Sequence, residues 1–318
     1  MDKKSSIFVA GHRGMVGSAI CRRLAAGGYD GVVTRTRAEL DLLDQRAVQA
    51  FLAEERPRYL FIAAAKVGGI HANDTFRADF LYQNLQIEAN LIHGAHLAGV
   101  ERLMFLGSSC IYPRDCPQPI REEYLLTGPL EPTNEPYAVA KIAGIKLCES
   151  HNRQYGRRYV SAMPTNLYGP NDNYDLATSH VLPALIRKAH EAKLRGDAEY
   201  VVWGSGTPRR EFLYVDDLAD ACVFLMERGD EAPALVNIGT GTDLSIAELV
   251  DLVMDVVGYR GRVVYDRSKP DGTPRKLLDV GRLSALGWRA RTSLREGVAQ
   301  AYAAFARSAS HTELPRQP

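Results

Sequence analysis

Short apolar runs alternate with longer stretches in which apolar residues recur every three or four positions throughout the first half of the chain. The short runs predict buried strands, and the periodic stretches predict helices. Strands that alternate with helices indicate a parallel sheet with right-handed crossover connections. The predicted strands are residues 6–11, 31–37, 59–65, 102–109 and 159–169, and the predicted helices are residues 15–26, 46–57, 83–99 and 136–156.

The pattern in the second half is less regular. Residues 180–196 predict a helix and residues 200–206 predict a strand. An extended run then leads into a further helix that Asp216 could cap, as Asp44 could cap the helix at residues 46–57. Ser245 and Ser293 each begin an S-x-x-E motif, so each could open a helix with a capping box.

These elements and the length of 318 residues predict one large domain or two coupled domains. We expect an α/β fold with a Rossmann-type, doubly wound parallel sheet in residues 1–165 and 209–240. A smaller, interleaved substrate-binding domain would comprise residues 166–208 and 241–318. Ligands should collect at the carboxyl ends of the parallel strands.

Composition narrows the possible partners. The net charge is +1, which gives no reason to expect nucleic acid or a membrane surface as a partner. No apolar run approaches the ~20 residues that a membrane span needs. Only four apolar residues, "IFVA", precede the first glycine loop, so we interpret them as a strand rather than as part of a signal peptide. Five cysteines without a CxxC pair suggest neither a disulfide framework nor a metal site, and reduced thiols indicate a cytoplasmic protein.

The glycine loop "GHRGMVG" places Gly11, Gly14 and Gly17 directly between the first predicted strand and the first predicted helix. Glycines there let the backbone turn tightly and approach a pyrophosphate at the helix N-terminus. The strand–loop–helix context favours a dinucleotide site over an ordinary glycine-rich turn. The GxxGxxG spacing is typical of short-chain dehydrogenases/reductases.

A basic position follows where an NAD-binding site would carry an acid. Arg37 lies about 20 residues after the glycine loop, with Arg35 nearby and Arg13 inside the loop. A guanidinium can pair bidentately with a 2′-phosphate, so we predict NADP(H) as the cofactor. The alternative is that these arginines are solvated surface charges.

"YAVAK" puts Tyr137 and Lys141 four residues apart, on one face of a predicted helix. A neighbouring ammonium should stabilise the phenolate and lower the pKa of the tyrosine, which suits proton transfer near neutral pH. Ser108 or Ser109, at the end of the preceding predicted strand, could hydrogen-bond a carbonyl oxygen that is being reduced, and by register Ser108 is the better candidate. Such a pair also occurs by chance in helices, but its place after this serine makes the combination specific.

With these motifs, the chain resembles the extended short-chain dehydrogenases/reductases that act on nucleotide sugars. The segments that carry the resemblance reach from the glycine loop to about Leu294 and include "FLGSSCIYP", "EPTNEPYAVAKIAGIKLCES", "MPTNLYGP", "VVWGSGTPRREFLYVDD" and "SKPDGTPRKLLD". The resemblance implies 3,5-epimerisation of GDP-4-keto-6-deoxy-D-mannose, followed by reduction of the C4 ketone with NADPH. Other nucleotide-sugar 4-epimerases and simple 4-keto reductases of this fold are the alternatives, and an NADP-binding sensor without turnover is a more distant one.

The resemblance also implies roles for two residues that sequence reasoning alone leaves open. Cys110 would be the base that removes the C3 and C5 protons, and His180 the acid that returns a proton to the opposite face. Without the resemblance, Cys110 is equally well a small buried residue, and His180 is more often a cap or a surface residue. Ser108, Tyr137 and Lys141 would carry the reduction.

Binding residues follow from the same resemblance. The cofactor would contact Gly11, Arg13, Gly14, Met15, Val16, Gly17, Arg37, Asp41, Leu42, Leu106, Gly107, Ser109, Lys141, Pro164, Thr165, Asn166, Leu167 and His180. The GDP-sugar would contact Lys188, Trp203, Arg210 and Asp271, with Arg275 and Lys276 as further basic candidates. Solvated charges and a core tryptophan are the alternatives for this second set. The helices at residues 83–98 and 137–155 would form a homodimer through a four-helix bundle.

Overall fold

The larger lobe is built on six parallel strands: β1 (Ile7–Ala10), β2 (Val32–Val33), β3 (Tyr59–Ile62), β4 (Arg102–Leu106), β5 (Arg158–Pro164) and β10 (Leu235–Ile238). The computed structural model describes residues 1–269 and 271–311. The strand order is β10-β5-β4-β3-β1-β2, so the connection direction reverses at β1. This doubly wound topology is the predicted one, and its reversal point is where such sheets bind nucleotides.

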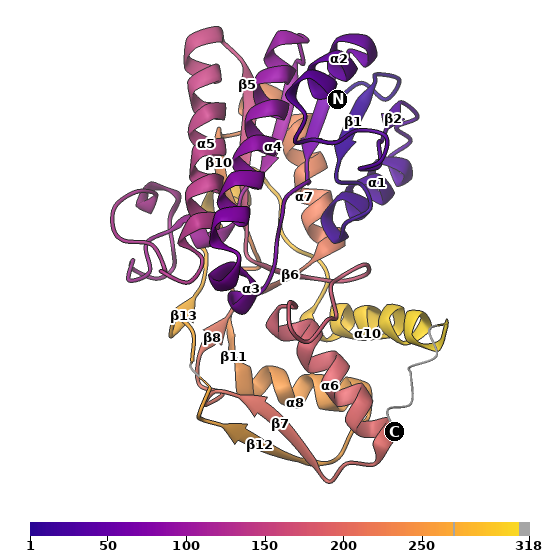
Figure 1. Ribbon diagram of the computed structural model, residues 1–318, viewed down its shortest axis with the longest axis vertical. Helices are drawn as coiled ribbons and strands as arrows, with labels where there is room; N and C mark the ends of the chain where they lie inside the picture. Colours follow the sequence, from indigo (N-terminus) through magenta and orange to yellow (C-terminus); the bar gives the residue numbers. More distant parts are fainter. Residues whose placement is uncertain (270, 312–318) are drawn as a thin grey trace.

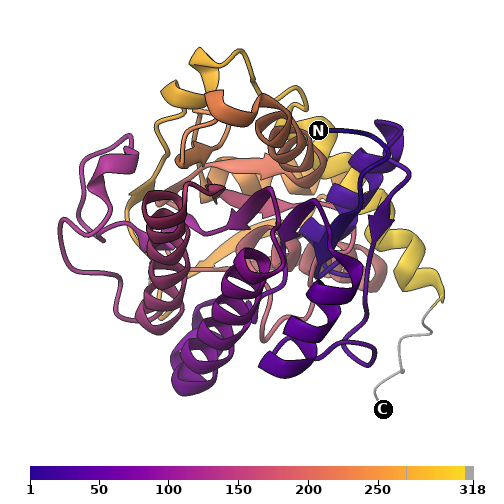
Figure 2. The same ribbon diagram turned by 90° about the horizontal axis from the view of Figure 1, so that it is seen from above.

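Helices cover both faces of this sheet. Alternate residues of β1 belong to two separate hydrophobic clusters, as the period of a strand requires: Ile7 and Val9 to one, Phe8 and Ala10 to the other. One face carries α1 (Met15–Ala26) and α7 (Val215–Arg228). The other carries α2 (Gln45–Glu55), α4 (Arg77–Leu97) and α5 (Glu135–Tyr155), which stand in a row in Figure 2.

The predicted helix starts are mostly confirmed. The Asp44 carboxylate accepts hydrogen bonds from two first-turn amides of α2. Ser245 forms a capping box with Glu248, and Ser293 exchanges the same hydrogen bonds with Glu296. The cap predicted at Asp216 is wrong: α7 begins one residue earlier, and the Asp216 carboxylate instead pairs with an arginine of α1.

The smaller lobe, in the lower part of Figure 1, surrounds a third hydrophobic cluster. Its helices are α6 (Val181–Arg195), α8 (Ile246–Val257) and α10 (Leu294–His311), and its parallel strands are β7 (Glu199–Trp203) and β12 (Arg262–Asp266). Tyr200 and Val202 are buried while Trp203 is exposed, so β7 turns one face to the helices and the other to solvent.

Short strands lie between the two lobes (Figure 1). In one sheet, β8 (Arg209–Arg210) lies between β11 (Leu244–Ser245), to which it is antiparallel, and β13 (Arg275–Lys276), to which it is parallel. In the other, β6 (Asn166–Tyr168) and β9 (Phe212–Tyr214) form a parallel pair. The remaining elements are α3 (Ile70–Thr75), α9 (Gly281–Ala285), η1 (Ser109–Ile111), η2 (Glu122–Tyr124) and η3 (Gly229–Glu231). None of the described helices is both long and apolar enough to cross a membrane.

Two predicted strands differ from the observed ones. The run at 31–37 pairs only at Val32–Val33. The run at 159–169 divides at Thr165, whose amide donates to Ile238 O and whose hydroxyl donates to Glu211 O, so the chain leaves the large sheet and pairs with β9. The chain crosses between the lobes several times, in keeping with the interleaved domains. Their boundaries stay a prediction, and residues 312–318 lie outside the described part.

Candidate active site

The glycine loop fits a dinucleotide pyrophosphate. Gly11 has a φ of +84°, and a Cβ on it would lie 2.7 Å from Ala64 N. A Cβ on Gly17 would lie 2.1 Å from Gly11 O, so both positions require glycine. Gly14 is the N-cap residue of helix α1, and no side chain caps this end of the helix. The first turn of α1 lies wholly in the described part of the chain and contains no acidic residue. Its N-terminus therefore remains open to an anion.

Two of the three arginines near this loop are available for a 2′-phosphate. Arg35 pairs with Glu55 and lies over the ring of Phe51, with 5.0 Å between guanidinium carbon and ring centre. Arg13 and Arg37 are exposed, and neither makes an ion pair with a carboxylate of the described residues. The charge next to the ribose would therefore come from Arg13 and Arg37.

Ser108, Tyr137 and Lys141 come from the adjacent elements β4 and α5. Ser108 caps η1, and its Oγ accepts a hydrogen bond of 3.4 Å from Cys110 N. Tyr137 is half-buried and Lys141 is 2% exposed. The Lys141 ammonium lies 5.8 Å from the Tyr137 ring centre, but only 2.8 Å from Glu88 Oε1 on α4.

The expected lowering of the Tyr137 pKa is wrong for this arrangement. Burial raises the pKa of Tyr137 well above its ordinary value, and the charges of Cys110 and Glu88 act in the same direction. The sequence-based argument counted the Lys141 ammonium as a partner of the phenol alone. In the fold that ammonium is already engaged by Glu88.

Cys110 and His180 face a common neighbour, Lys276 of β13. Burial raises the pKa of the Cys110 thiol, while the Lys276 charge and the hydrogen bond to Ser108 oppose this rise. Desolvation by the surrounding protein lowers the pKa of His180, and Lys276 lowers it further. The imidazole is nevertheless solvent-exposed, so it borders an open position rather than an enclosed one. The Lys276 charge therefore acts on both the thiol and the imidazole, although 70 residues separate them in the sequence.

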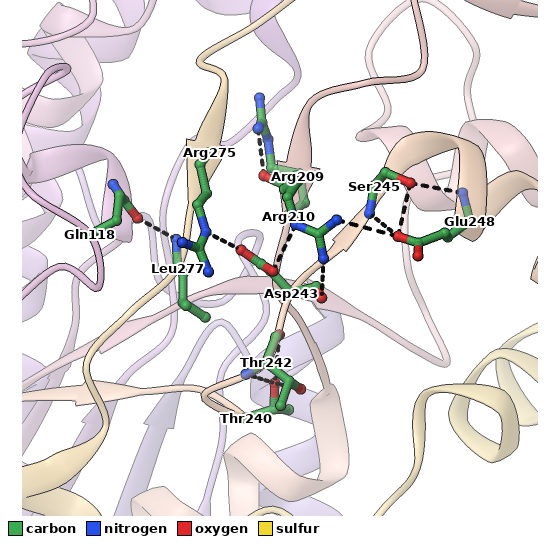
Figure 3. Close-up of polar contacts among 10 residues, drawn as sticks. All are labelled: Gln118, Arg209, Arg210, Thr240, Thr242, Asp243, Ser245, Glu248, Arg275 and Leu277. Atoms are coloured by element: carbon green, nitrogen blue, oxygen red, sulfur yellow. Dashed lines mark hydrogen bonds and ion pairs between the residues drawn. The ribbon is translucent and has the colours of Figure 1, made fainter.

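The short sheet between the lobes explains how Lys276 and Arg210 reach this site. Lys276 pairs in register with Arg210, and Arg275 with Arg209. Since side chains alternate along a strand, each pair shares one face. Arg209 Nε lies 2.9 Å from Asp243 Oδ1 and Arg275 Nε contacts Oδ2, whereas Arg210 points away from this carboxylate, as Figure 3 shows.

Glu211 anchors the same region from behind. Its buried carboxylate accepts hydrogen bonds of 2.7 Å from the amides of Thr240 and Gly241 and of 3.0 Å from Leu278 N. Its carbonyl oxygen accepts a hydrogen bond of 2.8 Å from Asn166 Nδ2. The Asn166 amide thus binds backbone here, and its contact with the cofactor stays a prediction.

A chain of polar contacts continues outward from Arg210. The Arg210 charge acts on Asp271, whose two oxygens accept hydrogen bonds of 2.9 and 2.6 Å from Ser205 N and Oγ. Next to this loop, Lys188 Nζ lies 4.5 Å from the ring of Trp203, which is 58% exposed. Trp203 is therefore not a core residue, and an aromatic ring or base can reach it.

The sequence model of the NAD dependent epimerase/dehydratase family matches residues 7–239 of this chain. GDP-L-fucose synthase of Escherichia coli (strain K12) is 59% identical over 310 residues, which covers 95% of this chain and 97% of that protein. GDP-L-fucose synthase 1 of Arabidopsis thaliana is 58% identical over 301 residues, with 95% of this chain and 93% of that protein covered. The chain belongs to the NAD dependent epimerase/dehydratase family.

A solved member of this fold supports the same conclusion. MlghC, the GDP-mannoheptose C4 reductase from Campylobacter jejuni with NADP bound, has a TM-score of 0.90 and 38% identity, covering 96% of this chain and 99% of that one. The doubly wound fold and the resemblance to nucleotide-sugar short-chain dehydrogenases/reductases are thus confirmed.

Most of the cofactor residues expected for this family lie at carboxyl ends of the strands of the large sheet. Met15 and Val16 are in the first turn of α1, Asp41 and Leu42 follow β2, Leu106 and Gly107 end β4, Ser109 opens η1, Pro164 and Thr165 end β5, and Leu167 lies in β6. Their contacts with the cofactor stay a prediction.

Two residues of the site were not anticipated from the sequence. Lys276 was expected only as a phosphate partner, and its nearness to the thiol follows from the register of β8 and β13. Glu88 was read as part of an amphipathic helix. An acid within the apolar stretch "LQIEANLI" was the one signal for it.

Proposed function

We propose that this chain is an NADPH-dependent enzyme that converts GDP-4-keto-6-deoxy-D-mannose to GDP-L-fucose by epimerisation at C3 and C5, then reduction at C4. The observation that carries the proposal is electrostatic nearness: the Cys110 charge acts on Tyr137, and the Lys276 charge acts on Cys110 and His180. These influences support a site in which an acid–base couple and a phenol donor act on one substrate. The names of the relatives that match most of the chain support the same reaction.

Epimerisation uses the acidity that the C4 ketone gives to the C3 and C5 protons. Cys110, as a thiolate, removes one proton to form an enolate, and His180 returns a proton to the opposite face. The Lys276 ammonium stabilises the thiolate against the cost of burial. Each inversion leaves Cys110 protonated and His180 neutral, so both groups exchange protons with solvent before the next inversion.

Reduction follows at the same carbon framework. Bound NADPH supplies the hydride for C4. Ser108 donates a hydrogen bond to the C4 carbonyl oxygen, and Tyr137 donates its phenolic proton to that oxygen. The raised pKa of Tyr137 keeps the phenol protonated at neutral pH, so the proton for the C4 oxygen is present. Gly11, Gly14 and Gly17 admit the cofactor pyrophosphate.

The GDP portion would extend along the contacts that lead away from Lys276. Arg210 pairs with the diphosphate through its planar guanidinium. Asp271 accepts a hydrogen bond from a sugar hydroxyl, and the guanine lies near Trp203 and Lys188. This order follows the spatial order of the residues from the thiol to the exposed indole.

The test supplies the purified chain with GDP-4-keto-6-deoxy-D-mannose and NADPH in deuterium oxide. We expect NADPH oxidation, deuterium at C3 and C5, and a product whose proton NMR spectrum is that of GDP-L-fucose. NADPH oxidation without inversion would contradict the proposal in favour of a simple C4 reductase, the activity named for the Campylobacter jejuni structure. Lower KM for NADH than for NADPH would contradict the roles of Arg13 and Arg37.

We further propose a cytoplasmic homodimer in which α4 and α5 of two copies form a four-helix bundle. Large apolar side chains are exposed on these helices, among them Tyr82, Leu97, Val139 and Tyr155. Five unpaired thiols suit a reducing compartment. Sedimentation that shows only monomer at micromolar concentration would contradict the dimer.

A further inference from the structure

Glu88 and Lys141 form an ion pair that differs from all others among the described residues. Both side chains are 2% exposed, and 2.8 Å separates Lys141 Nζ from Glu88 Oε1. In every other pair of the described part of the chain, at least one side chain is 30% exposed or more. Burying two charges is costly unless they stabilise each other, so an acid at this place in α4 calls for a reason beyond packing.

The neighbouring helix makes room for this carboxylate. Gly144 lies in the middle of α5, where glycine destabilises a helix by roughly 0.5–1 kcal/mol relative to alanine. A Cβ at this position would come within 2.8 Å of Glu88 Oε2 and 2.4 Å of Phe105 Cζ. Glycine therefore allows Glu88 and the ring of Phe105 to pack beneath Lys141.

The Glu88 carboxylate has few other partners. No donor among the described residues gives a hydrogen bond to Oε2. Burial raises the pKa of Glu88, and Lys141 is the group that opposes this rise. The lysine that the reduction requires is thus the group that favours the charged form of this carboxylate.

Four titratable groups determine the charge around the Tyr137 phenol. Cys110 on η1 and Glu88 on α4 disfavour the phenolate, and Lys141 lies one helical turn away on α5. Lys276 on β13 acts on Cys110 and favours its thiolate. Glu88 is the member of this set that has no part in the proposed chemistry.

We propose that Glu88 is a positioning residue for the reduction: it holds the Lys141 ammonium at the contact between α4 and α5 and thereby controls how readily Tyr137 gives up its proton. This inference rests on the proposed function. It assigns Glu88 an effect on C4 reduction and none on the proton exchange at C3 and C5.

The direction in which a change at Glu88 shifts Tyr137 deprotonation follows from the combined charge of Glu88, Lys141 and Tyr137. With Glu88 ionised and Lys141 protonated, loss of the Tyr137 proton takes the group from zero to one negative charge. With glutamine in place of Glu88, the same loss takes the group from one positive charge to zero. Deprotonation is therefore easier in Glu88→Gln, and the phenol donor is lost at lower pH.

The experiment measures the pH dependence of kcat for NADPH oxidation in wild type, Glu88→Gln and Glu88→Asp. In Glu88→Gln we expect the alkaline limb to move to lower pH by about one unit. Exchange of C3 and C5 deuterium should stay within about twofold of wild type, because Cys110 and His180 are unchanged. Glu88→Asp keeps the charge, so its alkaline limb should stay near that of wild type while kcat falls.

Ile145→Val is the matched control, since Ile145 is buried in the same cluster next to α4 and the change alters packing without charge. Its melting temperature should fall, with the alkaline limb unchanged. A difference absorbance titration, from which the corresponding Tyr137→Phe variant is subtracted, follows phenolate formation without any substrate. Phenolate formation should begin at lower pH in Glu88→Gln than in wild type.

An unchanged titration and an unchanged alkaline limb in Glu88→Gln would overturn the inference. So would an equal loss of exchange and reduction, which indicates a merely structural residue. If the wild type fails to oxidise NADPH, that outcome counts against the proposed function alone. The titration needs no turnover, so it would still show whether Glu88 controls the loss of the Tyr137 proton.

Discussion

The two halves of the candidate site are built in different ways. On the larger lobe, Ser108 caps η1 just after a five-residue strand, and Tyr137 and Lys141 lie on a 21-residue helix; all three are buried or half-buried. Between the lobes, Arg210 lies on a two-residue strand, and Trp203 of the smaller lobe is largely exposed. The residues proposed to carry the reduction thus differ from Arg210 in the regularity of their support, and from Trp203 in burial.

This difference has a physical reason. The phenol proposed to donate a proton needs a fixed distance to its acceptor and an environment that adjusts its pKa, and a half-buried place on a long helix supplies both. A diphosphate is recognised mainly by charge, and guanidinium groups can remain partly hydrated until the ligand arrives. The variants below test this contrast.

The largest effect is expected at the thiol. Cys110→Ser should reduce exchange of the C3 and C5 protons with solvent by at least about a hundredfold. A serine hydroxyl is much less acidic than a thiol, so the anion that would remove these protons rarely forms. NADPH affinity, measured by fluorescence titration, should stay within about twofold. If exchange continued at the wild-type rate, the role given to Cys110 would be wrong.

Arg210→Gln should raise KM for the GDP-sugar by about tenfold to a hundredfold, since a hydrogen bond to a charged group contributes about 1.5–3 kcal/mol. The kcat values should change little. Arg209→Gln is the matched control, because that residue faces Asp243 on the other side of the same strand. It should lower stability more than it changes KM. Equal KM effects from both variants would argue against separate faces.

Lys276→Met should slow exchange at neutral pH by about tenfold and move its whole pH profile upward. Lys276 lowers the pKa of Cys110 and of His180, so its removal raises both. The thiolate then forms at higher pH, and the imidazole stays protonated to higher pH. A profile that moved downward, or that narrowed from one side only, would contradict this shared influence.

The smallest effect is expected behind the site. Asp243→Asn should destabilise the fold by about 1–2 kcal/mol and raise KM a few-fold. Burial raises the pKa of Asp243, but hydrogen bonds from Arg275 and Arg209 outweigh this and lower it below 3.8. Its contribution is therefore complete above that pH and is lost as the pH falls through the lowered value. Urea unfolding should show a smaller difference in the free energy of unfolding between wild type and Asp243→Asn in acid than at pH 7.

The same contrast separates what the sequence could predict from what it could not. The glycine loop and the Tyr137–Lys141 pair are local patterns with fixed periods, so they could be found along the chain. Cys110 and His180 lie 70 residues apart, and only resemblance joined them. The nearness of Lys276 depends on the register of two-residue strands, which no periodicity reveals. The Tyr137 pKa was misjudged because Glu88, on another helix, engages the lysine.

The pairing of strands β8 and β13 also makes this site sensitive to a one-residue shift in strand register. Arg209 and Arg275 meet a carboxylate on one face, while Arg210 and Lys276 carry their charge to the other. Deleting one residue between Gly272 and Arg275 would slide the strand by one step and exchange the faces. Lys276 would then take the place of Arg275 beside Asp243, and Leu277 would take the place of Lys276. Which side chain acts on Cys110 thus depends on odd or even position along β13, so single-residue insertions and deletions here should be tolerated far less than substitutions.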